Sequence, residues 1–207
     1  MPSPLHEERL QTILSHLRRE GVRSVQDLGC GAGELLMRLR EESRFEELVG
    51  IDIDERALLA ARRVLGLDPL DRNGRIRVQR ASFEEADRRL QGFDAAVMLE
   101  TIEHIEPGRL SRVERAVFGR ARPRLVLVTT PNSEYNPVHG MAPGEKRHPG
   151  HYFEWDRARF QRWADGVAER QGYQVSFFDI GPPYPGCGSS TQMARFRVAE
   201  ASLSQSA

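Results

Sequence analysis

Three residues that can bind a metal ion or move a proton directly follow the apolar segment FDAAVML. Glu100, Glu103 and His104 stand at positions i, i+3 and i+4 of the stretch ETIEHI. At this spacing the side chains share one face of a helix, so we expect a helix that presents two carboxylates and an imidazole together. The competing interpretation is a solvated helix start, where acidic residues interact favourably with the helix dipole.

A second group of metal-capable residues lies further along the chain. His139, His148 and His151 fall in a segment rich in Pro, Gly and Asn, which we expect to be a loop from Pro131 to about His151. It follows RLVLVTT, the predicted neighbour of the strand FDAAVML, so the loop can deliver a ligand to the end of that strand. Two carboxylates with two imidazoles suit Mn²⁺, Co²⁺ or Mg²⁺, with manganese favoured by imidazole and zinc left open.

Such a site suggests a substrate as well as an ion. An octahedral ion held by four protein groups keeps two positions open, and the 3′ end of a ribose offers two vicinal hydroxyls. The ion would lower the pKa of a hydroxyl that is otherwise too weak an acid to react. It would also hold the oxygen in line with the group to be transferred, which saves orientation entropy.

The glycine-rich turn QDLGCGAGE is the second candidate site. Its glycines allow a ligand to approach the backbone, but Glu34 stands where a dinucleotide fingerprint requires glycine. Asp27 suits an ammonium group, and Asp52 at the end of the next strand suits two ribose hydroxyls. We therefore predict S-adenosylmethionine rather than a nicotinamide, with a turn that binds nothing as the remaining alternative. The predicted cofactor contacts are Asp27, Gly29, Gly31, Gly33, Asp52, Ile53, Ser82, Phe83 and Leu99.

These residues lie on an alternation of short apolar strands and amphipathic helices. Strands are predicted at 23–29, 47–53, 75–81, 93–99, 124–130, 173–180 and 192–199, and helices at 5–19, 34–42, 55–65, 84–90, 109–121 and 156–170. The alternation predicts an α/β fold with a mostly parallel seven-stranded sheet and helices on both faces. The last two strands have no helix between them, which predicts one antiparallel strand. Ligands bind such sheets at the carboxyl ends of the strands, where the candidate residues fall.

Composition restricts the class of protein. A chain of 207 residues with 39% hydrophobic and 29% charged residues is typical of one globular domain, which we place at 1–198 with a disordered tail at 199–207. A net charge of zero argues against a protein that coats long nucleic acids, but not against one that grips a strand end. The apolar runs are too short to span a membrane, no secretory signal is recognisable, and two cysteines make no disulfide framework. These features predict a reduced, cytoplasmic protein.

Four segments resemble a known family: ETIEHI, TTPNSEYN, RHPGHYFEW and STQMARF. They are similar to the small-RNA 3′-terminal ribose 2′-O-methyltransferases, the HUA-enhancer family, and most similar to its bacterial branch. The resemblance runs from about Leu10 to Phe196 and implies a Rossmann-like class I fold that uses S-adenosylmethionine. It further implies methylation of the 2′-hydroxyl at an RNA 3′ end with both hydroxyls free, in RNA repair beside a kinase-phosphatase-ligase, and no membrane partner.

Matched residue by residue, the resemblance assigns the metal ligands. They are Glu100, Glu103, His104 and His151. His148 is either a general base for the 2′-hydroxyl or a group beside the site. The family usually has an acidic and a basic residue around the ligand histidine, where this chain has Gly150 and Tyr152. Bacterial relatives typically carry an N-terminal ligase-adenylating domain that this sequence lacks, so an excised domain and a stand-alone form both stay open.

Several alternatives remain at this stage. Asn132 either orients the terminal nucleotide or caps a loop, Phe153 and Trp155 are core anchors rather than a base-stacking platform, and Cys30 is a small turn residue. A small-molecule O-methyltransferase acting on catechol-like diols is one rival function. A non-catalytic cofactor-binding subunit of a repair complex is the other.

Overall fold

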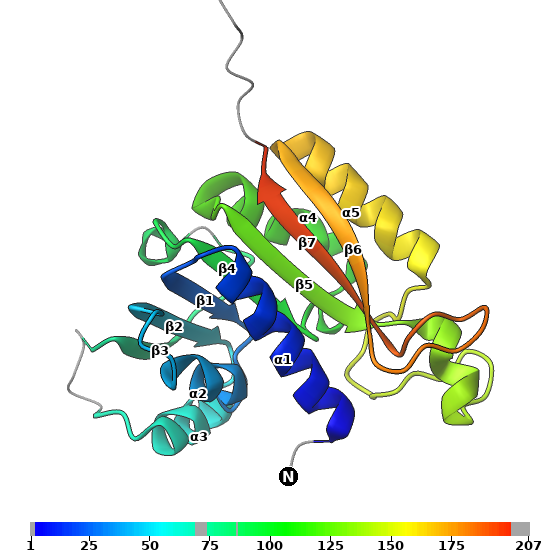
Figure 1. The fold of residues 1–207 in the computed structure, drawn as a ribbon, viewed down its shortest axis with the longest axis horizontal. Helices are drawn as coiled ribbons and strands as arrows, with labels where there is room; N and C mark the ends of the chain where they lie inside the picture. The colour runs from blue at the N-terminus through cyan, green and yellow to red at the C-terminus, as the bar shows by residue number, and fades with distance from the viewer. Residues whose placement is uncertain (1–2, 69–73, 86, 200–207) are drawn as a thin grey trace, which may run out of the picture.

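The computed structural model describes residues 3–68, 74–85 and 87–199, and within them one sheet runs through the molecule (Figure 1). Its strands are β1 (Ser24–Leu28), β2 (Glu47–Asp52), β3 (Ile76–Arg80), β4 (Ala95–Leu99), β5 (Leu125–Pro131), β6 (Tyr173–Ile180) and β7 (Thr191–Val198). The strand order is β3-β2-β1-β4-β5-β7-β6. The first five strands pair in parallel, and β7 is antiparallel to both β5 and β6. The predicted sheet with one antiparallel strand is confirmed.

Helices cover both faces of this sheet. The helices α1 (Pro4–Arg19), α2 (Glu34–Arg40) and α3 (Glu55–Leu65) pack on one face, and α4 (Leu110–Val113), its continuation Glu114–Ala121 and α5 (Arg157–Gln171) pack on the other. Each layer encloses its own apolar cluster against the sheet. The two clusters hold the strands rigidly, so their carboxyl ends form a fixed edge for a site.

Local sequence explains the helix boundaries. In α1 the apolar positions recur at helical spacing, and Leu10, Ile13 and Leu17 are fully buried. Ser3 caps the helix by accepting a hydrogen bond from the His6 N–H. In α3 the carboxylate of Asp54 accepts from Arg56 N–H, and Gly66 ends the helix in the left-handed conformation that glycine tolerates best.

Three predicted segments differ in the structure. In place of a helix at 84–90, the described residues have only a 3₁₀ turn, Arg88–Leu90. The loop after β5 contains a 3₁₀ segment, Ser133–His139, because Asn132 caps its start by accepting from Glu134 N–H. The helix predicted at 109–121 begins as α4 and then continues as a π-helix, Glu114–Ala121.

Two further observations concern the described part of the chain. No helix there is long and apolar enough to cross a membrane. Cys30 and Cys187 are both free thiols. Cys30 is buried, in agreement with its predicted role as a small turn residue. The predicted tail falls almost entirely outside the described residues.

Candidate active site

Glu100 lies where β4 ends, and its backbone is unusual. It has φ 52°, a left-handed conformation that costs a non-glycine residue roughly 1–3 kcal/mol. Its N–H donates to Thr129 Oγ1 over 2.9 Å, and its Oε2 lies 2.9 Å from the Arg9 guanidinium. The other oxygen, Oε1, is buried without a hydrogen-bond partner in the described chain. The surroundings therefore hold this carboxylate in place and leave one oxygen for a ligand.

Glu103 repeats this pattern more deeply in the protein. Its side chain is fully buried, Oε2 accepts from Thr130 Oγ1 over 2.9 Å, and Oε1 has no partner among the described residues. Burial, and then the nearby charge of Glu100, raises the pKa of Glu103 well above its usual value. Burial likewise raises the pKa of Glu100, against the opposing charges of Arg9, Arg147 and His151. Two adjacent buried carboxylates with unused oxygens fit a bound cation, which would supply the missing positive charge.

The predicted helix over this stretch is wrong in detail. Only Ile102–His104 form a 3₁₀ turn, and Glu100 precedes it in the left-handed conformation. The two carboxylates are nevertheless close enough for the charge of Glu100 to raise the pKa of Glu103. They are brought together by the turn of the chain at the end of β4 rather than by helical periodicity.

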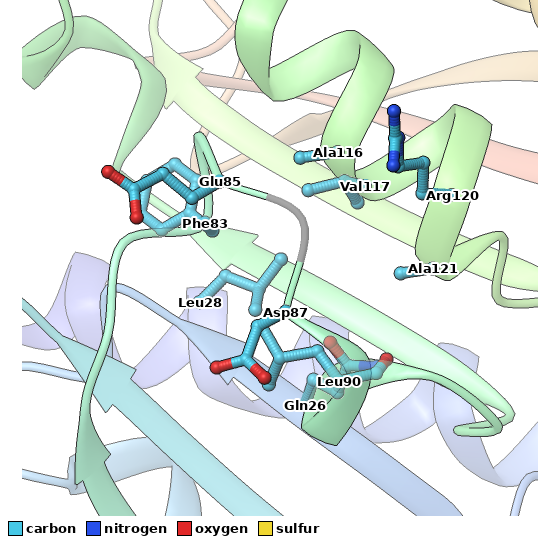
Figure 2. Close-up of a pocket in the computed structure, with 10 residues that line it drawn as sticks. All are labelled: Gln26, Leu28, Phe83, Glu85, Asp87, Leu90, Ala116, Val117, Arg120 and Ala121. Atoms are coloured by element: carbon cyan, nitrogen blue, oxygen red, sulfur yellow. The ribbon is translucent and has the colours of Figure 1, made fainter.

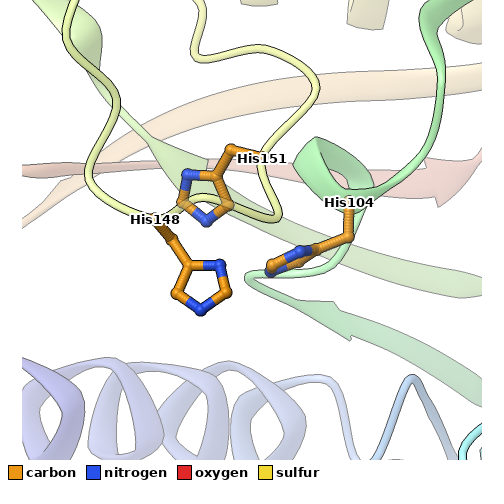
Figure 3. A group of neighbouring side chains, drawn as sticks. All are labelled: His104, His148 and His151. Atoms are coloured by element: carbon orange, nitrogen blue, oxygen red, sulfur yellow. The ribbon is translucent and has the colours of Figure 1, made fainter.

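Three histidines converge beside these carboxylates. His104 comes from the 3₁₀ turn, and His148 and His151 come from the long loop after β5 (Figure 3). One ligand-capable atom from each of the three lies within 4.8 Å of the others. The loop histidines thus lie beside His104, but neither Glu100 nor Glu103 joins this group at that spacing among the described residues. His139 does not join the cluster; its Nε2 lies 2.8 Å from Ser190 Oγ instead.

Hydrogen bonds distinguish the roles of the three rings. Nδ1 of His104 donates to the carbonyl of Gly150 over 3.1 Å, and Nδ1 of His151 contacts Glu154 Oε1 over 2.6 Å. Both rings therefore keep Nε2 as a free acceptor, the arrangement that orients metal-binding histidines. In contrast, His148 Nδ1 accepts from Gly150 N–H over 3.0 Å. Neutral His148 then carries its proton on Nε2 and donates, which favours a group beside the site over a general base.

Buried polar residues fix the histidine loop. Glu154 accepts from the Arg147 N–H and from Asn136 Nδ2 at 2.7 Å each, and hydrogen bonds lower its pKa although burial alone would raise it. The Arg147 guanidinium donates to the carbonyls of Asn132 and Ser190. Tyr152 N–H donates to the Glu103 carbonyl over 2.8 Å, which ties the loop to the carboxylate turn.

Gly150, one of the two departures from the family pattern, lies between the histidine rings. A Cβ at this position would stand 3.0 Å from His148 Nδ1 and 3.4 Å from His104 Nδ1. The backbone approaches both rings closely enough to bond each of them, and a side chain here requires the rings to shift. The positions of the His148 and His104 rings therefore depend on the absence of a side chain at Gly150.

The surroundings of Asn132, Phe153 and Trp155 indicate the roles of these three residues. Asn132 is fully buried; besides capping, its amide donates to the carbonyls of Cys187 and Ser189. These bonds favour the loop-cap interpretation. Phe153 and Trp155 stack at 4.1 Å within the apolar cluster, so they are core anchors as predicted.

A cavity of about 350 Å³ adjoins the carboxylates and contains most of the predicted cofactor residues. Its lining consists of Gly29, Asp52, Ile53, Ser82, Phe83, Glu84, Glu100, Thr101 and His104. Asp52 accepts hydrogen bonds from Gly31 N–H and Asp54 N–H, each over 2.9 Å, which fixes its carboxylate at the end of β2. A Cβ on Gly29 would lie 2.6 Å from Thr101 Cγ2, so this turn requires glycine there.

Four predicted cofactor residues do not line this cavity: Asp27, Gly31, Gly33 and Leu99. Asp27 is 2% exposed, and Leu99 packs against the apolar cluster on the α1 side of the sheet. Gly33 instead lets the start of α2 approach α3, since a Cβ there would lie 3.2 Å from that of Ala61. Gly31 contributes its N–H to Asp52. These residues shape the turn beneath the cavity.

Asp27 should make stability depend on pH. Burial, and then the charge of Asp52, raises its pKa to about 7. The folded state favours the protonated form of Asp27. The contribution of protonated Asp27 to the free energy of unfolding is therefore present below the unfolded pKa of about 3.9 and is lost as pH rises through 7. We expect Asp27→Asn to leave the free energy of unfolding nearly unchanged at pH 4 and to increase it at pH 8. Urea unfolding at both pH values measures this; an Asn variant with the wild-type pH profile would contradict it.

Sequence reasoning missed the groups that hold the site. Arg9, Thr129, Thr130, Arg147 and Glu154 all bond to candidate ligands or to their loop. Arg9 is far away in sequence, on α1, and only the fold brings it to Glu100. The threonine pair directly after the apolar core of β5 was the one local signal, since polar residues at the end of a buried strand mark the binding edge.

Comparisons with known proteins agree with this geometry. A family model described as a methyltransferase domain matches residues 26–125. A crystal structure of the methyltransferase domain of bacterial CtHen1 is 39% identical, with a TM-score of 0.85, covering 95% of this chain and 100% of that chain. The chain belongs to the Hen1 small-RNA methyltransferase family. The family resemblance and the Rossmann-like fold predicted from sequence are confirmed.

Other relatives show how much of each protein the similarity covers. The small RNA 2′-O-methyltransferase of Gallus gallus is 36% identical over 204 residues, which is 93% of this chain and 54% of that protein. The chain thus spans about half the length of the curated relatives that it matches. A structure of the Pnkp1/Rnl/Hen1 RNA repair complex matches with a TM-score of 0.69 over 94% of this chain and 42% of that chain, at 19% identity, which shows the shared fold.

Proposed function

We propose that the chain transfers the methyl group of S-adenosylmethionine to the 2′-hydroxyl of the 3′-terminal nucleotide of RNA, with a divalent metal ion at the carboxylate–histidine site. The observation that carries this proposal is the pair of buried oxygens without partners, Glu100 Oε1 and Glu103 Oε1, beside His104 and His151, each with a free Nε2. Two carboxylates and two imidazoles at one edge of a methyltransferase fold fit an ion such as Mn²⁺, with Mg²⁺ and Co²⁺ as alternatives.

The residues have separate tasks in this proposal. Glu100, Glu103, His104 and His151 would hold the ion, which would lower the pKa of the acceptor hydroxyl and fix its position. Asp52 accepts from the cofactor ribose, and Ser82, Phe83 and Ile53 surround its adenine end. Gly29 lies against the amino-acid end, and Asp27 holds the turn beneath it. His148 donates to the substrate from Nε2, and the hydroxyl proton passes to water while the S–CH₃ bond breaks and S-adenosylhomocysteine leaves.

The wider setting is proposed on the names of relatives. The Gallus gallus relative is a small-RNA methyltransferase, and the fold is shared with a protein of an RNA repair complex. Both are consistent with an RNA 3′ end as substrate and with a repair kinase-phosphatase-ligase as partner. Cytoplasmic localisation stays a prediction from the sequence.

The test is a series of RNAs that differ only at the 3′ end. With Mn²⁺ present, we expect methyl transfer to an RNA with both terminal hydroxyls, none to a 2′-deoxy end, and none to a 3′-phosphate end. The free diol is required because both hydroxyls are proposed to reach the ion. Incorporation of a labelled methyl group measures the transfer, and turnover of the 3′-phosphate RNA at the diol rate would refute the mechanism.

The two rival functions give different results in the same assay. A catechol-specific enzyme would methylate a catechol and ignore the RNA series. A non-catalytic cofactor-binding subunit would bind S-adenosylmethionine but transfer nothing to any substrate. The orphaned oxygens of Glu100 and Glu103 argue against the second rival, since a binding subunit has no use for a buried anionic pair.

A further inference from the structure

We propose that a groove lined by Arg112, Arg115 and Arg120 binds the phosphate groups of RNA upstream of the terminal nucleotide. The groove has a volume of about 290 Å³, and Glu84 and Ala116 complete its lining. All three arginines are exposed. This inference rests on the proposed function. It assigns a binding site to the RNA nucleotides that precede the terminal one.

The helix geometry gathers these charges on one side. Arg112 and Arg115 are three residues apart, so they lie on the same face of a helix. Arg115 and Arg120 are five residues apart, and in an α-helix they would diverge. The segment Glu114–Ala121 is instead a π-helix, whose wider i→i+5 turn brings residues five apart toward one face. The irregular helix thus turns three scattered arginines into one basic groove.

Two of the acids at or beside the groove are already paired with other side chains, whereas a third, Glu85, lines a small cavity that shares Arg120 with the groove. Glu84 is held by Arg109 through two hydrogen bonds of 2.8 and 2.7 Å. Glu114 is held by Arg170 and Gln171. In contrast, Arg112, Arg115 and Arg120 make no ion pair or side-chain hydrogen bond with any described residue.

A second, small cavity shares Ala116 and Arg120 with the groove. It holds about 10 Å³, space for roughly one water, and its lining includes Phe83, Glu85, Ala116 and Arg120 (Figure 2). A nucleobase cannot enter this small cavity, so an RNA ligand at this place must lie in the groove itself. Arginine side chains bind phosphate oxygens in pairs, which suits sequence-independent contact with an RNA backbone.

The groove adjoins the cavity that contains Glu100. Glu84 lines both, and the helix that carries the arginines follows His104 in the chain after one short 3₁₀ turn, Pro107–Arg109. A strand whose last nucleotide lies at Glu100 can therefore leave past Glu84 toward Arg112. The chain has no net charge, so this local patch supplies an attraction that the protein as a whole does not.

The test compares RNA binding by four forms of the chain. They are wild type, Arg112→Ala/Arg115→Ala/Arg120→Ala, the same triple substitution to Lys, and a charge-matched control, Arg19→Ala/Arg63→Ala/Arg162→Ala, made at exposed arginines on α1, α3 and α5. Fluorescence anisotropy with a trinucleotide and a dodecanucleotide, both ending in a free diol, gives Kd over a range of salt concentrations. Thermal unfolding confirms that all four forms are folded.

We expect the alanine triple to bind the dodecanucleotide at least about tenfold more weakly, and to reduce the slope of log K against log salt by about 2, the value for three lost contacts with a single strand. Trinucleotide binding should not change, and the lysine triple should recover most of the affinity. Equal binding of the dodecanucleotide by the alanine triple and the control triple would overturn the proposal. This is also the result expected if the groove binds a protein instead of RNA.

Failure of the proposed function would be separable from failure of the groove. Methyl transfer to the trinucleotide by wild type tests the function and does not involve the arginines. If transfer is absent while the alanine triple still loses dodecanucleotide binding, the groove remains an RNA-binding site and the acceptor hydroxyl is wrongly assigned.

Discussion

Replacing Glu103 by glutamine is expected to lower methyl transfer to a diol-ended RNA by more than about 100-fold, because loss of even an outer partner of a metal ligand costs about 10–100-fold. Glutamine keeps the shape of the side chain and can still accept from Thr130 Oγ1. It removes the charge that a divalent ion requires. Single-turnover transfer of a labelled methyl group measures the loss.

A second measurement separates metal binding from general damage to the fold. Ligand binding to the folded state raises the melting temperature by mass action, so Mn²⁺ should stabilise wild type and not Glu103→Gln. In the presence of EDTA the variant should melt no lower than wild type, because burial of the Glu103 carboxylate already opposes its charge. Glu106→Gln, at an exposed position three residues on, is the matched control and should behave as wild type. A Glu103→Gln chain that still gains stability from Mn²⁺ would rule out this residue as a ligand.

Substitution of Asp52 by asparagine is expected to weaken S-adenosylmethionine binding about 10–100-fold, since hydrogen bonds to a charged group contribute roughly 1.5–3 kcal/mol. Both carboxylate oxygens are fixed by backbone N–H groups, from Gly31 and Asp54. An asparagine amide would set an N–H against one of these donors as well as losing the charge. Isothermal titration calorimetry with the cofactor gives the change in Kd.

Asp54→Asn is the control for this experiment. Asp54 caps α3 through its side chain, and asparagine caps as well as aspartate. We expect its Kd for the cofactor to match wild type. Mn²⁺ binding should be unaffected in both variants, because Asp52 lies at the cofactor end of the cavity. Wild-type affinity in Asp52→Asn would show that the cofactor ribose is bound elsewhere.

The sheet could be predicted from the sequence because its information is local. Short apolar runs alternate with helical stripes, and β1 to β5 appear within a residue or two of their predicted bounds. Residues that end strands, such as Asp52 and Glu100, could likewise be placed at the ligand-binding edge, since in a parallel sheet all carboxyl ends face one way. The ETIEHI motif and the histidine loop then indicated the family.

The details of the site depended on contacts between distant segments. Arg9 reaches Glu100 from α1, and Glu154 orients His151 only once the loop has folded back. The left-handed Glu100 and the π-helix at 114–121 contradict the local preference for regular helix, and tertiary packing stabilises both.

The fold class, the binding edge and the candidate ligands could be predicted from the sequence, because strand and helix periodicity is encoded over a few residues. Only the tertiary structure decided which oxygens are left unpaired, which histidine nitrogens are free, and that Arg112, Arg115 and Arg120 form one groove. Hydrogen-bond partners and charge neighbours are set by distances in space, and periodicity along the chain does not specify them.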